Sequence, residues 1–105
     1  MTHRDEINRL VEAELKEANK KYPLFSSQHE AYAVLKEEVE EMVEEAEKCK
    51  EHLQDIWRST RNDFECDYSI KNLRGRALYT VQEGIQVIAM CDKAMTSLEK
   101  KRESR

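Results

Sequence analysis

A helical seam in the middle of the sequence is the feature that most restricts how this chain can fold. Its apolar residues recur in alternating steps of four and three, at Ala31, Leu35, Val39, Met42, Ala46, Cys49, Leu53 and Ile56. This spacing predicts one long amphipathic helix with a partner along its apolar stripe. Two glycines and one proline in 105 residues leave little material for turns, and 38% of the residues are charged. The sequence therefore predicts an all-α fold in a single domain, residues 1–105.

Three helices are expected, over about residues 5–21, 28–60 and 69–100. Pro23 ends the first helix, and the apolar side chains of residues 22–25 are expected to plug the end of the core. Ser27 followed three residues later by Glu30 is a capping-box pattern, which predicts the start of the second helix. The periodicity breaks at residues 61–68, RNDFECDY, and this break predicts the turn into the third helix.

The second and third helices are expected to form a long antiparallel hairpin. The second is roughly 45 to 50 Å long at about 1.5 Å per residue. A compact chain of this size has a radius of gyration of about 13 Å, so this helix must project beyond a compact globule or pack in an oligomer. Residues 84–91, GIQVIAMC, are apolar on nearly every side, which predicts burial against more than one neighbour. Both features predict a homo-oligomer, a dimer or a dimer of dimers, in which two hairpins share a four-helix core.

The charge of the chain excludes some classes of partner. Its net charge is −4, whereas binding to nucleic acid or to an anionic membrane depends on concentrated positive potential. No apolar run approaches the length of about 20 residues that spans a bilayer. We therefore expect neither a nucleic-acid nor a membrane partner, and we expect phosphates to be bound through metal ions.

The cysteines are odd in number and lack the spacing of a metal site. Cys49, His52 and Cys91 would need a fourth ligand to hold zinc, so buried thiols are the expectation. Residues 1–6 are polar and do not resemble a secretory leader. We therefore expect a reducing, cytoplasmic location.

Acidic side chains are expected to converge at mid-hairpin. If the turn is centred near residue 62, Glu41 lies opposite Glu83, and Glu38 lies opposite Gln86. Carboxylates held close together repel one another unless a cation or protons neutralise them. Mg²⁺ prefers oxygen ligands and would meet this need. The alternative is that these are ordinary glutamates at the edge of the seam, paired with lysines or arginines.

Two short motifs resemble a known family. KEEVEEM at residues 36–42 resembles the EExxE signature of the MazG-like, all-α nucleoside triphosphate pyrophosphohydrolases, and QEGIQVIAM at residues 82–90 resembles their second motif, ExxD. Residues 25–42 are also similar to short MazG-like proteins of bacteriophages and prophages. The resemblance implies a Mg²⁺-dependent hydrolase that converts a nucleoside triphosphate to the monophosphate and pyrophosphate.

The resemblance also implies roles for individual residues. Glu38, Glu41 and Glu83 would be Mg²⁺ ligands, and Glu37 and Glu38 would be the catalytic carboxylates. Gln86 stands where the family has the motif aspartate; its amide oxygen can ligate a metal but brings no charge and cannot act as a base. Catalysis is therefore expected to be impaired. The alternative is a non-catalytic nucleotide-binding or protein-interaction module of phage origin.

Substrate contacts are expected from three further residues. His29 could touch a base or a phosphate, Arg76 could neutralise the leaving phosphates, and Tyr79 could stack on a base. Each has a structural alternative: a surface histidine near a cap, an arginine paired with glutamates of the second helix, and an aromatic side chain of the core or of an interface.

Overall fold

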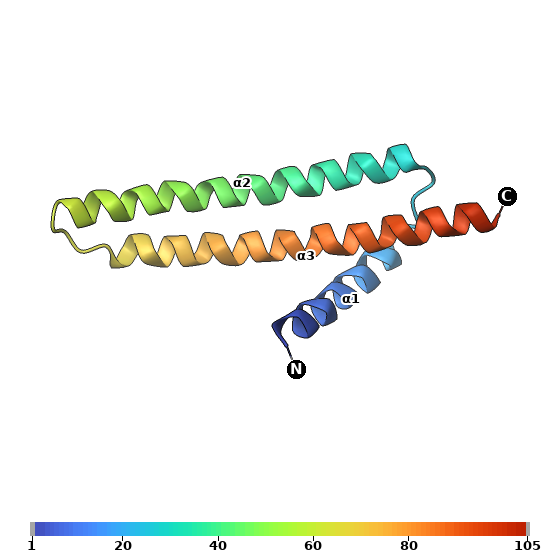
Figure 1. The fold of residues 1–105 in the computed structure, drawn as a ribbon, viewed down its shortest axis with the longest axis horizontal. Helices are drawn as coiled ribbons and strands as arrows, with labels where there is room; N and C mark the ends of the chain where they lie inside the picture. The colour runs from blue at the N-terminus through green and yellow to red at the C-terminus, as the bar shows by residue number, and fades with distance from the viewer. Residues whose placement is uncertain (1, 105) are drawn as a thin grey trace.

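The structure, a computed structural model, describes residues 2–104, which form three helices (Figure 1). These are α1 (His3–Lys21), α2 (Gln28–Arg61) and α3 (Asp67–Glu103). The described residues contain no strand, so the prediction of an all-α fold is confirmed. No helix among them combines the length and the apolar character needed to cross a membrane.

Side chains cap the starts of α1 and α2, whereas the start of α3 has no side-chain cap hydrogen bond. The Thr2 hydroxyl accepts from the Asp5 N–H at 3.1 Å, and the Asp5 carboxylate accepts from the Thr2 N–H at 3.2 Å, so α1 begins with a capping box. Ser27 caps α2 as predicted, accepting from the Glu30 N–H at 3.0 Å. The other half of the predicted capping box is wrong, because the Glu30 carboxylate accepts instead from the Ser26 hydroxyl at 2.7 Å.

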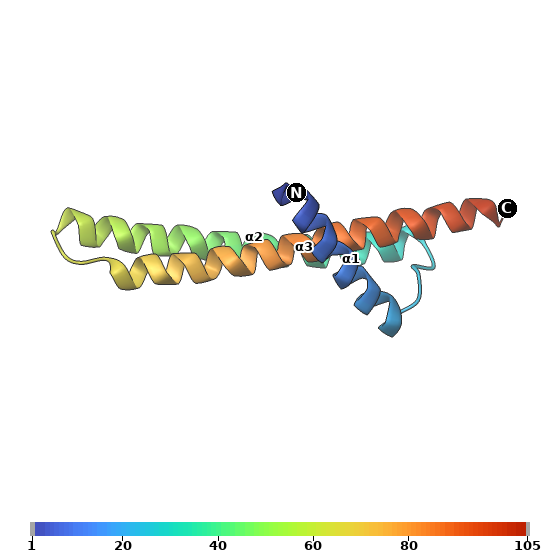
Figure 2. The same ribbon diagram turned by 90° about the horizontal axis from the view of Figure 1, so that it is seen from below.

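The hairpin of α2 and α3 gives the molecule its length. The two helices run antiparallel and side by side in both views (Figures 1 and 2). The radius of gyration is 18.3 Å and the extents are 66 × 33 × 21 Å. A compact chain of this size would have a radius of gyration of about 13 Å. In the turn, Asp63 adopts a φ of 57°, a left-handed conformation that aspartate tolerates better than most residues.

Helix α1 crosses α3 and packs on it alone. Among the described residues, no Cα atom of α1 comes within 8 Å of one in α2. Figure 2 shows α1 lying obliquely across the hairpin. Val11 is fully buried at this crossing. Because α1 packs on α3 and not on α2, a space remains between α1 and α2.

The linker between α1 and α2 is docked onto α3 by Phe25. The Phe25 ring is buried, and its N–H donates to the Ser97 hydroxyl at 2.9 Å. That hydroxyl donates in turn to the Lys93 carbonyl at 2.7 Å. The predicted plug is therefore confirmed for Phe25. It is wrong for Tyr22, which is 67% exposed because only its carbonyl turns toward the core.

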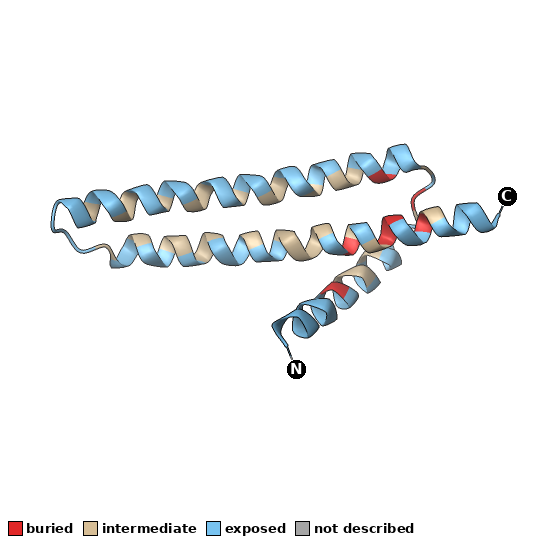
Figure 3. Cartoon of the chain, in the orientation of Figure 1, coloured by how far each residue is buried: buried red, intermediate tan, exposed pale blue. Residues whose placement is uncertain are grey.

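The core is concentrated at one end of the hairpin. Figure 3 shows the buried residues where the helices and the linker meet, while the half nearer the turn has only half-buried and exposed residues. Ala89 is fully buried there, in agreement with the expectation for residues 84–91. Ile88 and Cys91 remain exposed, so burial on nearly every side is not reached within one chain.

The predicted apolar seam of α2 is only partly buried. Five of its eight residues are buried or half-buried, but Val39, Ala46 and Leu53 are exposed. Three polar residues beside the seam, Glu38, Glu45 and His52, are half-buried instead. The reason is that the apolar surface of α2 is wider than the strip that one helix can cover. The prediction is therefore wrong at these positions.

Seven of the exposed apolar residues lie on one side of the hairpin. We define the outer apolar face as seven side chains that are 40–57% exposed: Val39, Val43, Leu53 and Trp57 of α2 with Val81, Ile88 and Met95 of α3. At about 100° per residue, these side chains lie on the side of the hairpin opposite Glu41 and Gln86. The hairpin therefore has an acidic side and an apolar side.

Candidate functional site

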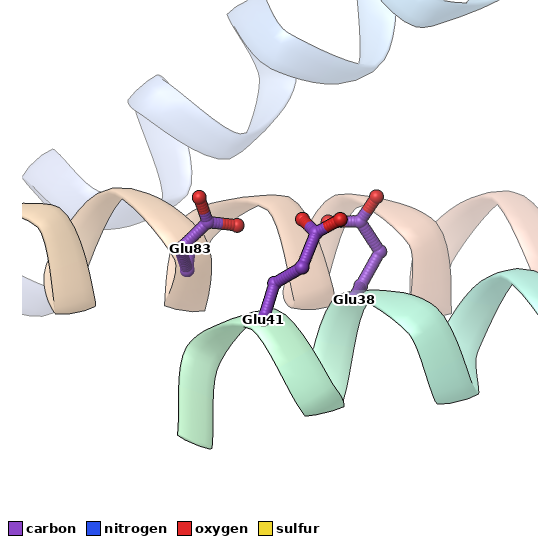
Figure 4. A group of neighbouring side chains, drawn as sticks. All are labelled: Glu38, Glu41 and Glu83. Atoms are coloured by element: carbon purple, nitrogen blue, oxygen red, sulfur yellow. The ribbon is translucent and has the colours of Figure 1, made fainter. Parts of the chain in front are cut away.

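Three glutamates meet at the middle of the hairpin. Glu38 and Glu41 lie one turn apart on α2, and Glu83 faces them from α3. Carboxylate oxygens of the three lie within 4.8 Å of one another, and Figure 4 shows the side chains turned together. We call this group the carboxylate cluster. The predicted register, with Glu41 opposite Glu83, is confirmed.

Gln86 is also in the predicted place. Its amide lies between two carboxylates, and with its nitrogen turned toward them it donates to Glu38 Oε2 at 3.1 Å and to Glu83 Oε2 at 3.2 Å. A half-turn of the amide would present the carbonyl oxygen to the same space. Gln86 can therefore hydrogen-bond the carboxylates or supply an oxygen ligand to a cation they share.

Crowding changes the acidity of the cluster. Partial burial raises the pKa of Glu38 above its usual 4.5, and the neighbouring carboxylates raise it further, Glu41 first. Partial burial also raises the pKa of Glu83, and Glu41 adds to this through its charge and through a hydrogen bond between the carboxyl groups. Both shifts mean that negative charge is costly here.

Basic side chains do not relieve this cost. None of the ion pairs described within residues 2–104 involves Glu38, Glu41 or Glu83. The alternative interpretation, glutamates paired with basic residues, holds for Glu45 instead. Glu45 pairs with Arg76 at 3.4 Å and with Lys48 at 3.2 Å.

The donor set of the cluster fits a small hard cation. Mg²⁺ takes oxygen ligands at about 2.1 Å, so two oxygens on opposite sides of the ion lie about 4.2 Å apart. The cluster oxygens lie within 4.8 Å, and glutamate side chains are long enough to close the difference. Three carboxylates and one amide oxygen would leave coordination positions for water or phosphate.

A groove opens beside the cluster, between α1 and α2, with α3 as its floor. Its volume is about 650 Å³, within the range of small-molecule sites. Its lining is Glu14, Glu17, Ala18, Lys21, Tyr22, Pro23, Phe25, Glu30, Val34, Glu37, Glu38, Gln86, Met90 and Lys93. Glu38 and Gln86 belong to both the groove and the cluster surroundings, so a ligand in the groove would reach the carboxylates.

The predicted substrate residues are not part of this groove. His29 is exposed in the first turn of α2. Arg76 pairs with Glu45, and its Cζ atom lies 5.8 Å from the centre of the Tyr79 ring. Tyr79 is 54% exposed. Arg76 and Tyr79 precede Glu83 on α3 and so lie between the cluster and the hairpin turn. The structure does not bring any of the three to the groove lining.

The cysteines do not assemble a zinc site. Cys49 Sγ lies 3.9 Å from Thr80 Oγ1, and Cys91 follows Thr80 by about 16 Å along α3. Cys91 is exposed, so the expectation of a buried thiol is wrong at this position. His52 Nδ1 is buried, and its nearest described carboxylate, Asp55, is 3.9 Å away.

Lys93 is the site residue that the sequence analysis missed. It lines the groove although the whole residue is only 3% exposed. Its ammonium donates to the Tyr22 carbonyl at 3.5 Å and lies 5.0 Å from the centre of the Phe25 ring. The available signal was its spacing of seven residues from Gln86, which places both on one face of α3.

Comparison with known proteins adds no relative to this description. No family model matches the sequence, and no curated protein or solved structure matches it either. The case for a function therefore rests on the carboxylate cluster, on Gln86 and on the groove beside them.

Proposed function

We propose that this chain is a Mg²⁺-dependent nucleoside triphosphate pyrophosphohydrolase, which forms a nucleoside monophosphate and pyrophosphate. The observation that carries the proposal is the carboxylate cluster, whose oxygens lie within 4.8 Å of one another at the edge of the groove. Bound Mg²⁺ would remove the repulsion among them and attract phosphate. The resemblance of the two motifs to MazG-like enzymes supports the same activity.

Each residue near the cluster has a role in this proposal. Glu38, Glu41 and Glu83 would hold Mg²⁺, with Gln86 adding its carbonyl oxygen. When bound, Mg²⁺ supplies charge neutralisation and a lower pKa for bound water. Glu37 is exposed on the groove beside Glu38, where its carboxylate can take the proton of an attacking water.

The bonds that change follow from the products. The water oxygen bonds to the α-phosphorus, and the bond from that phosphorus to the oxygen bridging it to the β-phosphorus breaks. Pyrophosphate leaves with the bridging oxygen, and Glu37 keeps the proton until it returns to solvent. Catalysis of this kind depends on positioning and on charge stabilisation rather than on a covalent intermediate.

The direct test measures pyrophosphate release from a panel of ribonucleoside and deoxyribonucleoside triphosphates with Mg²⁺. Wild type should be active on at least one, and Glu41→Gln should lose the activity. Glu44→Gln is the matched control, since Glu44 is exposed on the same helix and lies outside the cluster. Full activity in Glu41→Gln, or no release from any nucleotide, would reject the proposal.

Gln86 favours a second candidate function, nucleotide binding without hydrolysis. A cluster of three carboxylates and a neutral amide carries one negative charge fewer than the family motif, which weakens its hold on Mg²⁺. Mg²⁺-dependent nucleotide binding without pyrophosphate release would select this alternative. Thermal melts that respond neither to Mg²⁺ nor to nucleotide would reject both, because a ligand of the native state raises its stability.

We also propose that two copies pair through the outer apolar face to complete a four-helix core. Seven side chains that are 40–57% exposed on one side of the hairpin support this arrangement. The carboxylate clusters would face outward, away from the pairing surface. Wild type should sediment as a dimer and Leu53→Lys as a monomer, with Glu44→Lys as the control. A monomeric wild type would refute the pairing.

A further inference from the structure

The groove contains a buried cation with spare hydrogen-bonding capacity. Lys93 is 3% exposed, and the one hydrogen bond described for its ammonium is the 3.5 Å bond to the Tyr22 carbonyl. An ammonium has three donors. No ion pair described within residues 2–104 includes it, and the Phe25 ring offers only a π face. Burial in this state is costly, so a ligand oxygen in the groove would be favoured as a partner.

The lining of the groove divides along α3. Gln86 marks the end beside the carboxylate cluster, and Lys93 lies two helical turns away, at about 10 Å. Met90 lies between them on the same face, with Val34 of α2 also in the lining. A nucleotide with its phosphates at the cluster would place its flat base in this apolar middle section. The far edge of the base would then point toward Lys93.

The charge of the groove lining indicates whether a phosphate or a neutral group would bind beside Lys93. The groove lining has five carboxylates and two ammonium groups, contributed by Glu14, Glu17, Glu30, Glu37 and Glu38 and by Lys21 and Lys93. A phosphate without a metal would be repelled by this excess of negative charge. A neutral carbonyl oxygen accepts a hydrogen bond without that penalty. The Lys93 end of the groove therefore suits a base rather than a second phosphate.

Bases differ at the edge that would meet Lys93. At C4 of a pyrimidine or C6 of a purine, thymine and guanine carry a carbonyl oxygen, whereas cytosine and adenine carry an amino group. An ammonium donates hydrogen bonds and cannot accept them. A carbonyl would complete the hydrogen bonds of Lys93, and an amino group would oppose donor to donor.

We infer that Lys93 selects nucleotides whose base has a carbonyl oxygen at this edge, namely uracil, thymine, guanine and hypoxanthine, over cytosine and adenine. This inference rests on the proposed nucleotide site, to which it adds a base preference. Lys93 would touch the substrate at the base, remote from the phosphates.

Two pairs of ligands that differ at this edge test the inference. Calorimetry with Mg²⁺ would compare the non-hydrolysable α,β-methylene triphosphates of inosine and adenosine, and then those of uridine and cytidine. Wild type should bind the carbonyl member of each pair about ten- to a hundredfold more tightly. Lys93→Met should bring the ratio near one, and Lys93→Arg should retain a preference. Lys100→Met is the control, since Lys100 is exposed on the same helix and lies outside the groove lining.

The outcomes separate the inference from the function beneath it. Equal affinities within both pairs for wild type would overturn the role of Lys93 and leave the Mg²⁺ and nucleotide site standing. An unchanged ratio in folded Lys93→Met would do the same. Failure of wild type to bind any of the four analogues would overturn both. If Lys93→Met does not fold, equal affinities in wild type would still overturn the inference, and Lys93→Arg tests the same position.

Discussion

Removing the charge of Glu41 is expected to stabilise the metal-free protein and to abolish its response to Mg²⁺. Glu41 is the neighbouring carboxylate that contributes most to the raised pKa of both Glu38 and Glu83. Two unit charges at the cluster limit of 4.8 Å repel by about 1 kcal/mol in water and by about 3.5 kcal/mol at an effective dielectric constant of 20. The cluster is half exposed, so the lower figure applies. Glu41→Gln removes two such repulsions, about 2 kcal/mol in total.

Thermal melts with and without Mg²⁺ would measure this effect. Each kcal/mol is worth about 4–8 °C in Tm for a domain near this size, so Glu41→Gln should melt well above wild type in a chelator. With Mg²⁺ at about one hundred times its Kd, wild type should gain about 2.7 kcal/mol. Glu41→Gln should gain little, because the amide oxygen of glutamine brings no negative charge to the cation. Added Mg²⁺ should therefore reduce the difference between the two melting temperatures or reverse its sign.

The pH dependence follows from the direction of the pKa shifts. Glu38 and Glu83 have folded-state pKa values above the usual 4.5, so their ionised forms destabilise the metal-free native state at neutral pH. As the pH falls from neutrality toward 4.5, these groups take up protons in the folded state first, and the repulsion is relieved. The advantage of Glu41→Gln over wild type in chelator should therefore shrink over this range.

Glu44→Gln provides the control for this set of measurements. It removes the same charge from an exposed position on the same helix, so its Tm should stay near that of wild type and its response to Mg²⁺ should be intact. A Glu41→Gln protein that is less stable than wild type in chelator would refute the argument from repulsion. A full Mg²⁺ response in that variant would refute the assignment of Glu41 as a ligand.

Three further predictions concern other positions. Gln86→Asp adds a fourth carboxylate and should increase Mg²⁺ affinity in calorimetry; unchanged or weaker binding would mean that Gln86 is not at a ligand position. Gly75→Ala should stabilise α3 by about 1 kcal/mol in urea unfolding, because a Cβ there meets nothing within 4 Å; a loss of stability would contradict the open surroundings. Ser97→Ala leaves the buried Phe25 N–H without its acceptor and should cost about 1–3 kcal/mol in the same assay. A neutral Ser97→Ala would show that this hydrogen bond does not hold the linker.

The register of the hairpin was predictable because it depends on counting from one turn. Residues at equal distances from residue 62 lie side by side in an antiparallel pair, so Glu41 falls opposite Glu83, and Gln86 falls beside Glu38. The turn itself was visible as a break in periodicity rich in asparagine and aspartate. Local sequence signals were therefore sufficient to predict the convergence of the carboxylates.

The rotation of each helix was harder to predict. The apolar surface of α2 is wide enough to offer two lines of contact, and periodicity alone does not select between Val39 and Glu38 as the position beside α3. The crossing of α1 depends on contacts between distant segments, and the groove depends on that crossing. Lys93 was missed because a lysine with this little exposure is rare, and no local pattern marks it.

The antiparallel pairing of α2 and α3 also determines the order in which the chain can fold. Contacts near the turn join residues close in sequence, so little entropy is lost in making them, and pairing can extend from there one helical turn at a time. The bond from the Phe25 N–H to Ser97, by contrast, joins residues 72 positions apart. We expect the hairpin to form on the microsecond-to-millisecond timescale of helical proteins, with the linker and α1 docking afterwards. The groove would then be the last part of the molecule to assemble.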